Sequence, residues 1–171
     1  MTRIELREAL APEDHDRARA LCETFRDWLR VRYADHPVVV GDYYGDAAWA
    51  PLMADLPTLH APPEGAILLA FLDGRLAGCT MLRALPEPGL CEMKRMYVEA
   101  FARGTGVASA LVEGLCDLAR ARGYRTMRLD TGRLQVEAQA LYRRSGFVER
   151  GPYYDPPENL CELLVYFERA L

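Results

Sequence analysis

Apolar residues recur along this chain with two different periods, and each period predicts one kind of element. In residues 3–8 apolar and polar side chains alternate, which is the pattern of a short strand. From Pro12 to about Tyr33 the apolar positions follow helical spacing, and Pro12 suits the first turn of a helix. The apolar stripe of this helix consists of Ala18, Leu21, Cys22, Phe25, Trp28 and Leu29, and His36–Pro37 ends it.

The middle of the chain changes from a weak pattern to a clear one at residue 66. Residues 38–63 are hard to interpret, with one short helix expected at about residues 47–55. The segments AILLAFL (66–72) and RLAGCTMLR (75–83) are joined by Asp73-Gly74, which predicts a β-hairpin because Asp-Gly favours tight turns with positive φ. A turn at residues 86–89 leads to a third strand at residues 91–98.

The C-terminal half alternates between helical and strand patterns. A helix begins at residue 107 and ends near Gly123, with an apolar face of Val107, Ala108, Leu111, Val112, Leu115 and Leu118. The expected elements after it are a strand at 125–130, a helix at 134–145, a strand at 147–150, a loop at 153–159 and a strand at 161–167. Hairpin strands come first and one β-α-β crossover lies in this half, so the sequence predicts an α/β domain with a mixed sheet over residues 1–171.

Composition and charge exclude several classes of protein. A chain of 171 residues, half of them hydrophobic, suits one soluble globular domain. The formal net charge of −4 argues against nucleic acid as a partner that is bound through bulk charge. The charged N-terminus shows no secretory signal, and the longest apolar run, residues 66–72, is too short to span a membrane.

Cysteine and histidine spacing gives no metal site. The five cysteines (Cys22, Cys79, Cys91, Cys116 and Cys161) are odd in number and contain no C-x-x-C pair, which indicates reduced thiols in a cytoplasmic protein. The three histidines, His15, His36 and His60, lack ligand spacing. We therefore expect no bound metal.

The stretch ARGTGVASALVEG, residues 102–114, places two glycines where a helix begins. The first turn of a helix has backbone N–H groups without internal partners and carries partial positive charge. Glycines let a ligand approach that backbone, and Arg103 adds a guanidinium that matches phosphate oxygens. The stretch therefore suits a pyrophosphate site. The alternative is that Gly104 and Gly106 only shape the turn between strand and helix. The stretch at residues 102–114 matches neither a Walker loop nor a Rossmann fingerprint.

Two motifs resemble those of the GNAT acetyltransferase superfamily. Arg103, Gly106 and Ala108 match its Q/R-x-x-G-x-G/A motif, and Ala138-x-x-Leu141-Tyr142-x-x-x-Gly146-Phe147 is similar to its second motif. The resemblance extends in element order from about Arg3 to the C-terminus, and the sequence looks like a bacterial branch of small, mostly uncharacterised members. It implies the GNAT (acyl-CoA N-acyltransferase) fold, with a mixed, mostly antiparallel sheet flanked by helices.

The same resemblance implies acetyl-CoA as co-substrate. In this superfamily the strand before the pyrophosphate site splays from its neighbour, and its free backbone groups bind the pantetheine arm. In this chain those residues would be Met96, Tyr97 and Val98. The pyrophosphate would lie on the backbone of Arg103, Gly104, Thr105, Gly106, Val107, Ala108 and Ser109.

Acetyl transfer to an amine requires a base for the ammonium, and Glu92 is the candidate. Its place on the strand resembles that of the glutamate base of some family members. Strand alternation would put Glu92, Lys94, Met96 and Val98 on one face. The alternative role for Glu92 is an ion pair with Lys94, Arg95 or another arginine.

Tyr142 matches the family tyrosine that faces the coenzyme sulfur and protonates the departing thiolate. Its alternative role is that of a core residue packed on the helix stripe. One departure from the family pattern is Gln135, which stands where asparagine often contacts the pantetheine arm.

The acceptor is predicted only by class. Asp35, Asp42, Asp46 and Asp55, with Tyr43, Tyr44 and Trp49, crowd residues 35–55, and Tyr153, Tyr154 and Asp155 lie in a late loop. These residues would suit a cationic amine, or they are solvated loop residues. We expect an N-acetyltransferase that joins acetyl-CoA and a primary amine of a small molecule or protein in a ternary complex. The alternatives are a non-catalytic acyl-CoA sensor or scaffold and a subunit that completes a homodimer.

Overall fold

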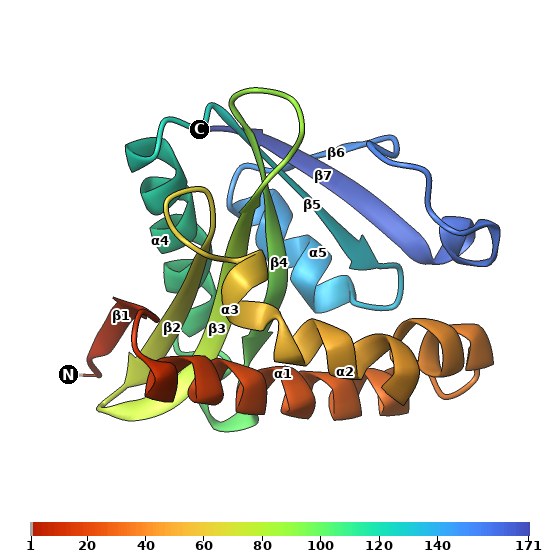
Figure 1. The fold of residues 1–171 in the computed structure, drawn as a ribbon, viewed down its shortest axis with the longest axis horizontal. Helices are drawn as coiled ribbons and strands as arrows, with labels where there is room; N and C mark the ends of the chain where they lie inside the picture. The colour runs from red at the N-terminus through yellow and green to blue at the C-terminus, as the bar shows by residue number, and fades with distance from the viewer. Residues whose placement is uncertain (1) are drawn as a thin grey trace.

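Seven strands form one sheet, with helices against both of its faces (Figure 1). The computed structural model describes residues 2–171. The strands are β1 Ile4–Glu8, β2 Ala66–Leu72, β3 Arg75–Ala84, β4 Leu90–Val98, β5 Thr126–Gly132, β6 Val148–Arg150 and β7 Leu164–Ala170. The α-helices are α1 Pro12–Arg32, α2 Asp46–Ala54, α3 Leu56–Leu59, α4 Val107–Ala121 and α5 Val136–Arg144. Shorter helical turns are η1 Val39–Tyr43, η2 Ala100–Ala102 and η3 Glu158–Leu163.

The strand order is β1-β2-β3-β4-β5-β7-β6. Strands β4 and β5 are parallel, and every other neighbouring pair is antiparallel. The parallel pair exists because α4 carries the chain from the end of β4 back to the start of β5. The predicted mixed, mostly antiparallel sheet is therefore confirmed.

Strands β4 and β5 pair over only part of their length. Leu90–Glu92 of β4 lie opposite Thr126–Arg128 of β5, and beyond these residues the two strands have no paired positions. They diverge toward their carboxyl ends, and α5 lies beside the opening (Figure 1). The structure thus has the splay that the family resemblance implied, in the middle of the sheet.

A bulge in β4 changes which side chains share a face. The register against β3 shifts between Cys79, which faces Tyr97, and Met81, which faces Lys94. Arg95 lies in this bulge with a φ of 49°. One extra residue reverses the alternation. The expectation that Glu92, Lys94, Met96 and Val98 share a face is therefore wrong, because Met93, Met96 and Val98 all pack in the core on the α4 side.

Each face of the sheet has its own core. On one face α4 buries Val107, Leu111, Val112 and Leu115 completely, as its pattern predicted, whereas Ala108 and Leu118 are only partly buried. On the other face α1, α2 and α3 pack against β2, β3 and β4 through residues such as Leu21, Trp49 and Leu69. No helix within residues 2–171 has the length and apolar character needed to cross a membrane.

The last strand begins later than its sequence pattern predicted. We expected a strand at residues 161–167, but η3 Glu158–Leu163 comes first and β7 spans Leu164–Ala170. Leu160, only 5% exposed, packs in η3 against Leu29, Tyr33 and Val39. This contact places the η3 turn against α1 and η1. The hydrophobic pattern of residues 158–163 does not predict it.

Candidate active site

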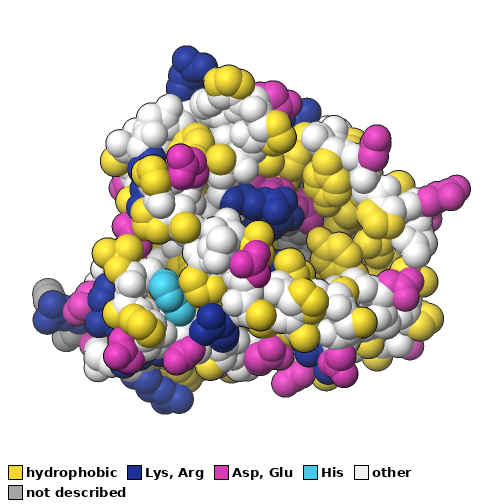
Figure 2. Space-filling view, viewed as in Figure 1, with side chains coloured by type: hydrophobic (Ala, Val, Ile, Leu, Met, Phe, Trp, Pro, Cys, Tyr) yellow, Lys and Arg dark blue, Asp and Glu magenta, His cyan; other side chains and the backbone are white. Residues whose placement is uncertain are grey.

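A cavity of about 310 Å³ opens where α1, η1 and α2 face the diverging ends of β4 and β5. The space-filling view shows a hollow on this face between hydrophobic side chains, with basic and acidic side chains meeting beside it (Figure 2). Six aromatic residues line the cavity: Phe25, Tyr33, Tyr43, Tyr44, Trp49 and Tyr142. The charged residues in its lining are Asp42, Lys94, Arg95 and Asp130. The cavity therefore has aromatic and aliphatic walls and a few charged groups, from β4, β5 and η1.

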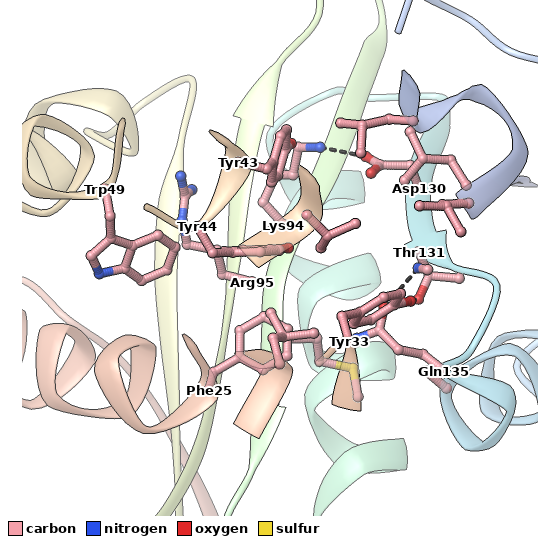
Figure 3. Close-up of a pocket in the computed structure, with 18 of the residues that line it drawn as sticks. Phe25, Tyr33, Tyr43, Tyr44, Trp49, Lys94, Arg95, Asp130, Thr131 and Gln135 are labelled. Atoms are coloured by element: carbon pink, nitrogen blue, oxygen red, sulfur yellow. Dashed lines mark hydrogen bonds and ion pairs between the residues drawn. The ribbon is translucent and has the colours of Figure 1, made fainter. Parts of the chain in front are cut away.

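The Lys94 ammonium joins two carboxylates at the point where β4 and β5 separate. It forms ion pairs with Asp130 on β5 and, at 3.1 Å, with Glu92 on its own strand (Figure 3 shows the contact with Asp130). Burial opposes the charge on Lys94, but the two carboxylates outweigh burial and raise the pKa of the ammonium. Lys94 therefore stays charged and holds Glu92 and Asp130 together.

Glu92, the predicted base, lies behind the cavity wall. Its side chain is fully buried, and it is absent from the cavity lining. Arg83 Nε donates to its carboxylate at 2.5 Å, and the Tyr153 hydroxyl donates to it at 2.5 Å. Glu92 thus forms ion pairs with Lys94 and an arginine, which is its alternative role. Its role as base stays a prediction.

Asp130 is the carboxylate that sequence analysis missed. Its side chain lines the cavity and is 10% exposed. The Tyr153 hydroxyl lies 3.5 Å from Asp130 Oδ1 and so connects this carboxylate to Glu92. Asp130 comes near the carboxyl end of β5, the parallel neighbour of β4. Because functional groups collect at the carboxyl ends of parallel strands, this position was the signal available in the sequence.

Tyr142 lies on α5, between the cavity and the gap that separates the diverging ends of β4 and β5. Its ring packs on Phe147 and Phe167 and is 6% exposed, and its hydroxyl lies 3.9 Å from the sulfur of Met96. Burial, followed by the charge of Asp130, raises the pKa of this phenol above its ordinary value of 10.0. Tyr142 therefore keeps its proton at neutral pH and can donate it to an anion beside Met96.

The glycine turn before α4 presents unpaired backbone N–H groups. Gly104 and Gly106 have φ values of 77° and 95°, and a Cβ on Gly104 would meet open space. In the part of the chain that the structure describes, the N–H groups from Gly104 to Ser109 have no protein acceptor. Thr105 turns its hydroxyl away, to the carbonyl of Ala102. The turn therefore offers a row of backbone donors without protein partners, as an anion site requires.

The backbone of β4 points partly into the gap. Glu99 N–H donates to Ala77, and Gly78 lies opposite Val98, so the Val98 N–H and C=O point away from β3. Arg103 Nε donates to the Val98 carbonyl at 3.1 Å, which places its guanidinium near the rings of Trp28 and Tyr97. Tyr97 lies opposite Cys79 in the ladder with β3, and its side chain packs toward α1.

The sequence profile of the Acetyltransferase (GNAT) family matches residues 13–147, which is most of the chain. This chain belongs to the GNAT acetyltransferase family. It is 40% identical over 132 residues to the IAA acetyltransferase of Azospirillum brasilense, a match that covers 77% of this chain and 83% of that protein. It is 34% identical over 100 residues to human N-acetylaspartate synthetase, covering 58% of this chain and 33% of that protein.

Solved structures of GNAT proteins share the fold across nearly the whole chain. The paiA N-acetyltransferase of Thermoplasma acidophilum in complex with coenzyme A has a TM-score of 0.70, with 17% identity and 99% of each chain covered. A GNAT acetyltransferase of Staphylococcus aureus has a TM-score of 0.72 with 16% identity, covering 98% of this chain and 99% of that one. This GNAT protein is an acetyl-CoA-dependent N-acetyltransferase, and the comparisons give no support to a non-catalytic sensor.

Among the polar residues of this GNAT chain that the sequence pointed to, Gln135 and Asp42 line the cavity. Gln135 accepts hydrogen bonds at Oε1 from the Gly132 N–H at 2.6 Å and from the Thr131 hydroxyl at 3.0 Å. Its amide oxygen therefore shapes the start of α5. Of the four N-terminal aspartates, Asp42 lines the cavity, whereas Asp35, Asp46 and Asp55 are exposed outside its lining.

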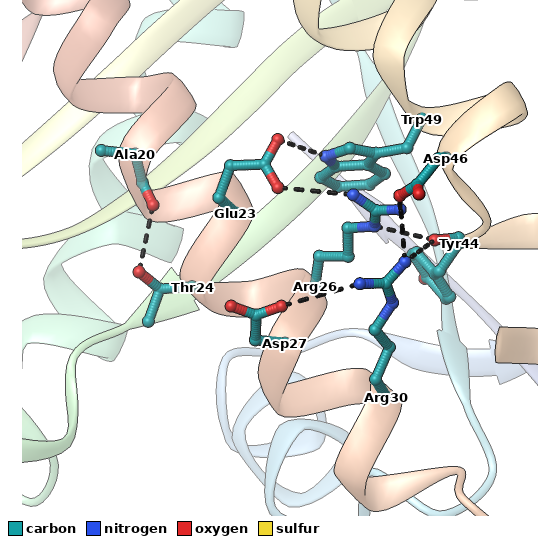
Figure 4. Close-up of polar contacts among 9 residues, drawn as sticks. All are labelled: Ala20, Glu23, Thr24, Arg26, Asp27, Arg30, Tyr44, Asp46 and Trp49. Atoms are coloured by element: carbon teal, nitrogen blue, oxygen red, sulfur yellow. Dashed lines mark hydrogen bonds and ion pairs between the residues drawn. The ribbon is translucent and has the colours of Figure 1, made fainter.

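The aromatic wall on the α2 side is fixed by a buried arginine. Arg26 on α1 donates to the Tyr44 carbonyl at 2.7 Å and pairs with Asp46, whose pKa is lowered by the hydrogen bonds from Arg26 and Arg30 (Figure 4). The indole of Trp49 donates to Glu23 at 2.7 Å. These contacts tie η1 and α2 to α1 and hold Tyr44 and Trp49 in the cavity wall.

Proposed function

We propose that this GNAT enzyme binds acetyl-CoA in the gap between β4 and β5 and acetylates a primary amine that enters the aromatic cavity. Residues 1–171 would act as one catalytic domain. One observation carries the proposal: Met96 and Tyr142 line the cavity, and they contact each other beside the gap. A thioester at this point and an amine in the cavity would meet there, which supports direct attack in a ternary complex.

The residues present fit the coenzyme. The unpaired N–H groups of Gly104–Ser109 and the nearby Arg103 suit its diphosphate, and the Val98 N–H, with Met96 beside it, suits the pantetheine arm. Acetyl-CoA supplies an activated acyl group whose leaving thiolate needs one proton. Tyr142 holds that proton next to Met96, so we assign it the role of general acid.

The base is proposed to be a carboxylate pair. Asp130 lies in the cavity wall, where an ammonium can reach it. Glu92 lies behind Asp130 and contacts the same two residues, Lys94 and Tyr153. Asp130 would receive the proton of the amine, and Glu92, the base predicted from sequence, would be linked to Asp130 through Lys94 and Tyr153.

The test is thiol release from acetyl-CoA in the presence of an amine library of polyamines, aminoglycosides, amino acids and amino-terminal peptides. We expect turnover that is confined to one class and saturates with the amine. Release at the same slow rate with and without every amine, by protein that binds coenzyme A, would contradict the proposal.

We also propose that the enzyme works in the cytoplasm and that it can form a homodimer. All five cysteines are free, and Cys22, Cys79, Cys91 and Cys116 are buried thiols, which supports a reducing cytoplasm as the working environment. No group of three metal-binding side chains occurs among residues 2–171, and the proposed chemistry uses none. A homodimer would be detected by gel filtration at two concentrations.

A further inference from the structure

Arg95 differs from the other basic residue of the cavity. Lys94 is neutralised by Asp130 and Glu92, whereas no carboxylate within residues 2–171 lies within 4.0 Å of the Arg95 guanidinium. Figure 3 shows the two side chains leaving β4 in different directions, Lys94 toward Asp130 and Arg95 toward the side where Trp49 lies. A guanidinium is therefore present, without a counter-ion from the protein, in a cavity whose walls are mostly aromatic and aliphatic.

A neutral histidine holds Arg95 in this position. The buried His60 ring bonds through Nδ1 to the Leu82 carbonyl at 2.9 Å, so Nδ1 carries the proton and Nε2 is an acceptor. Arg95 Nη1 donates to Nε2 at 3.1 Å. Burial lowers the pKa of His60 to about 4, which keeps the ring neutral and able to accept this bond at neutral pH. The contact orients the guanidinium and leaves its charge uncompensated.

The backbone of β4 is distorted at the same residue. Arg95 has a left-handed φ of 49°, a conformation that costs a residue with a side chain roughly 1 kcal/mol. In a regular strand Lys94 and Arg95 would point to opposite faces, but the bulge lets both line the cavity. The strain therefore serves to bring a second cation to the cavity.

We propose that the acceptor is an amino acid or a related amine that carries a carboxylate, and that Arg95 binds this carboxylate. The inference rests on the proposed function and names the substrate class of the same site. The amine would lie toward Asp130 and Tyr142, and the carboxylate would lie against Arg95. Phe25, Tyr44, Trp49 and Leu52 would surround an aromatic or large apolar side chain. Such an acceptor supplies the counter-charge that Arg95 lacks, which a simple cationic amine does not.

The test compares acceptors that differ only in the carboxylate: L-phenylalanine with 2-phenylethylamine, and L-tryptophan with tryptamine. The expected kcat/KM is at least about 30-fold higher for each amino acid, the range of a charge-assisted hydrogen bond. Arg95→Gln should reduce this preference to about 3-fold or less, and Arg95→Lys should retain part of it. Arg120→Gln is the control, because Arg120 lies on α4 outside the cavity lining, where it pairs with Asp117, and the preference of this variant should match wild type.

A binding measurement separates this inference from the proposed function. Calorimetry with N-acetyl-L-phenylalanine and coenzyme-saturated protein should show binding that Arg95→Gln weakens at least about 10-fold. Such binding without any turnover would contradict the proposed function and support the carboxylate site. Turnover of both amines and amino acids at equal efficiency would support the proposed function and overturn the carboxylate site, and so would equal binding by wild type and Arg95→Gln.

Discussion

Tyr142 is a single residue whose surroundings set its chemical role. Its hydroxyl is buried beside Met96, with a pKa held above its ordinary value by burial and Asp130. We predict that Tyr142→Phe lowers kcat by roughly 10- to 100-fold, because a thiolate with a pKa near 8.5 needs only modest help from an acid. Calorimetry should find the affinity for coenzyme A unchanged.

Tyr124→Phe is the matched control for Tyr142. It also removes a hydroxyl, one that donates to the Glu64 carbonyl at 2.7 Å away from the cavity. Its kcat should equal that of wild type. Equal kcat values for Tyr142→Phe and the control would show that the acid is another group.

The carboxylate pair gives a second prediction for single residues. Asp130→Asn and Glu92→Gln should each lower kcat/KM by about 100-fold, because Asp130→Asn removes the proposed proton acceptor and Glu92→Gln removes the carboxylate linked to it through Lys94. Affinity for coenzyme A should stay nearly constant. Full activity of Glu92→Gln across the pH range would exclude Glu92 from the base, and the same result for Asp130→Asn would exclude Asp130.

His60 predicts a pH dependence of stability. Its pKa in the folded protein is about 4, below the ordinary 6.5, so the unfolded chain binds a proton that the folded chain does not. This stability is present above pH 6.5 and is lost as pH falls toward 4. Between about pH 7.5 and about pH 5 wild type should lose about 2 kcal/mol from this source.

Urea unfolding at the two pH values measures this effect. Asn at position 60 keeps an N–H for the Leu82 carbonyl but does not titrate, so His60→Asn should show a smaller loss of stability than wild type. The other titrating groups are common to both proteins and cancel in the difference. Parallel pH profiles for the two proteins would contradict a neutral, buried His60.

Among elements, the start of α4 is the one that binds the coenzyme in this account. Gly104 has a left-handed φ, and the space that a Cβ would occupy there is open. The same holds for Gly123 beyond the end of the same helix, with a φ of 85°. Alanine at either position should cost about 1 kcal/mol of stability, measured by denaturant unfolding. Only Gly104→Ala should also weaken coenzyme binding, because its methyl group would occupy the anion site. Equal coenzyme affinities for the two variants would place the diphosphate elsewhere.

Element periodicity shows which parts of the fold were predictable. The stripe of α4 and the hairpin of β2 and β3 follow from local spacing and the Asp73-Gly74 turn, and both occur as expected. The bulge at Arg95 does not follow from β4 alone, since it is defined by pairing with β3. That bulge decides which β4 side chains reach the cavity, so Arg95 could not be singled out in advance.

The candidate site was predictable where one motif contains it. Tyr142 and the Gly104–Gly106 turn lie within short motifs, and the structure has Tyr142 in the cavity lining and the turn at the start of α4. Asp130 and Arg95 belong to different strands and acquire their roles from Lys94 and His60, which lie 36 and 35 residues away in sequence. Contacts at such separations follow from the sheet and not from local pattern.

For the molecule as a whole, the divided sheet implies that the coenzyme stabilises the fold. The unpaired carboxyl ends of β4 and β5 leave a gap in the middle of the sheet, and under the proposed function a ligand bound only by the folded state would fill it. At a coenzyme concentration of about 100 times Kd the gain is about 2.7 kcal/mol, or roughly 5–10 °C in Tm. Thermal unfolding with and without coenzyme A checks this. An unchanged Tm would mean that the folded protein does not bind it.

The most direct test of the account is a crystal structure of the protein with coenzyme A. We predict that the diphosphate accepts hydrogen bonds of about 3 Å from backbone N–H groups between Gly104 and Ser109, and that the sulfur lies in the gap beside the Tyr142 hydroxyl, facing the aromatic cavity. Coenzyme bound outside the gap, or a sulfur separated from the cavity by the wall of β4, would contradict it.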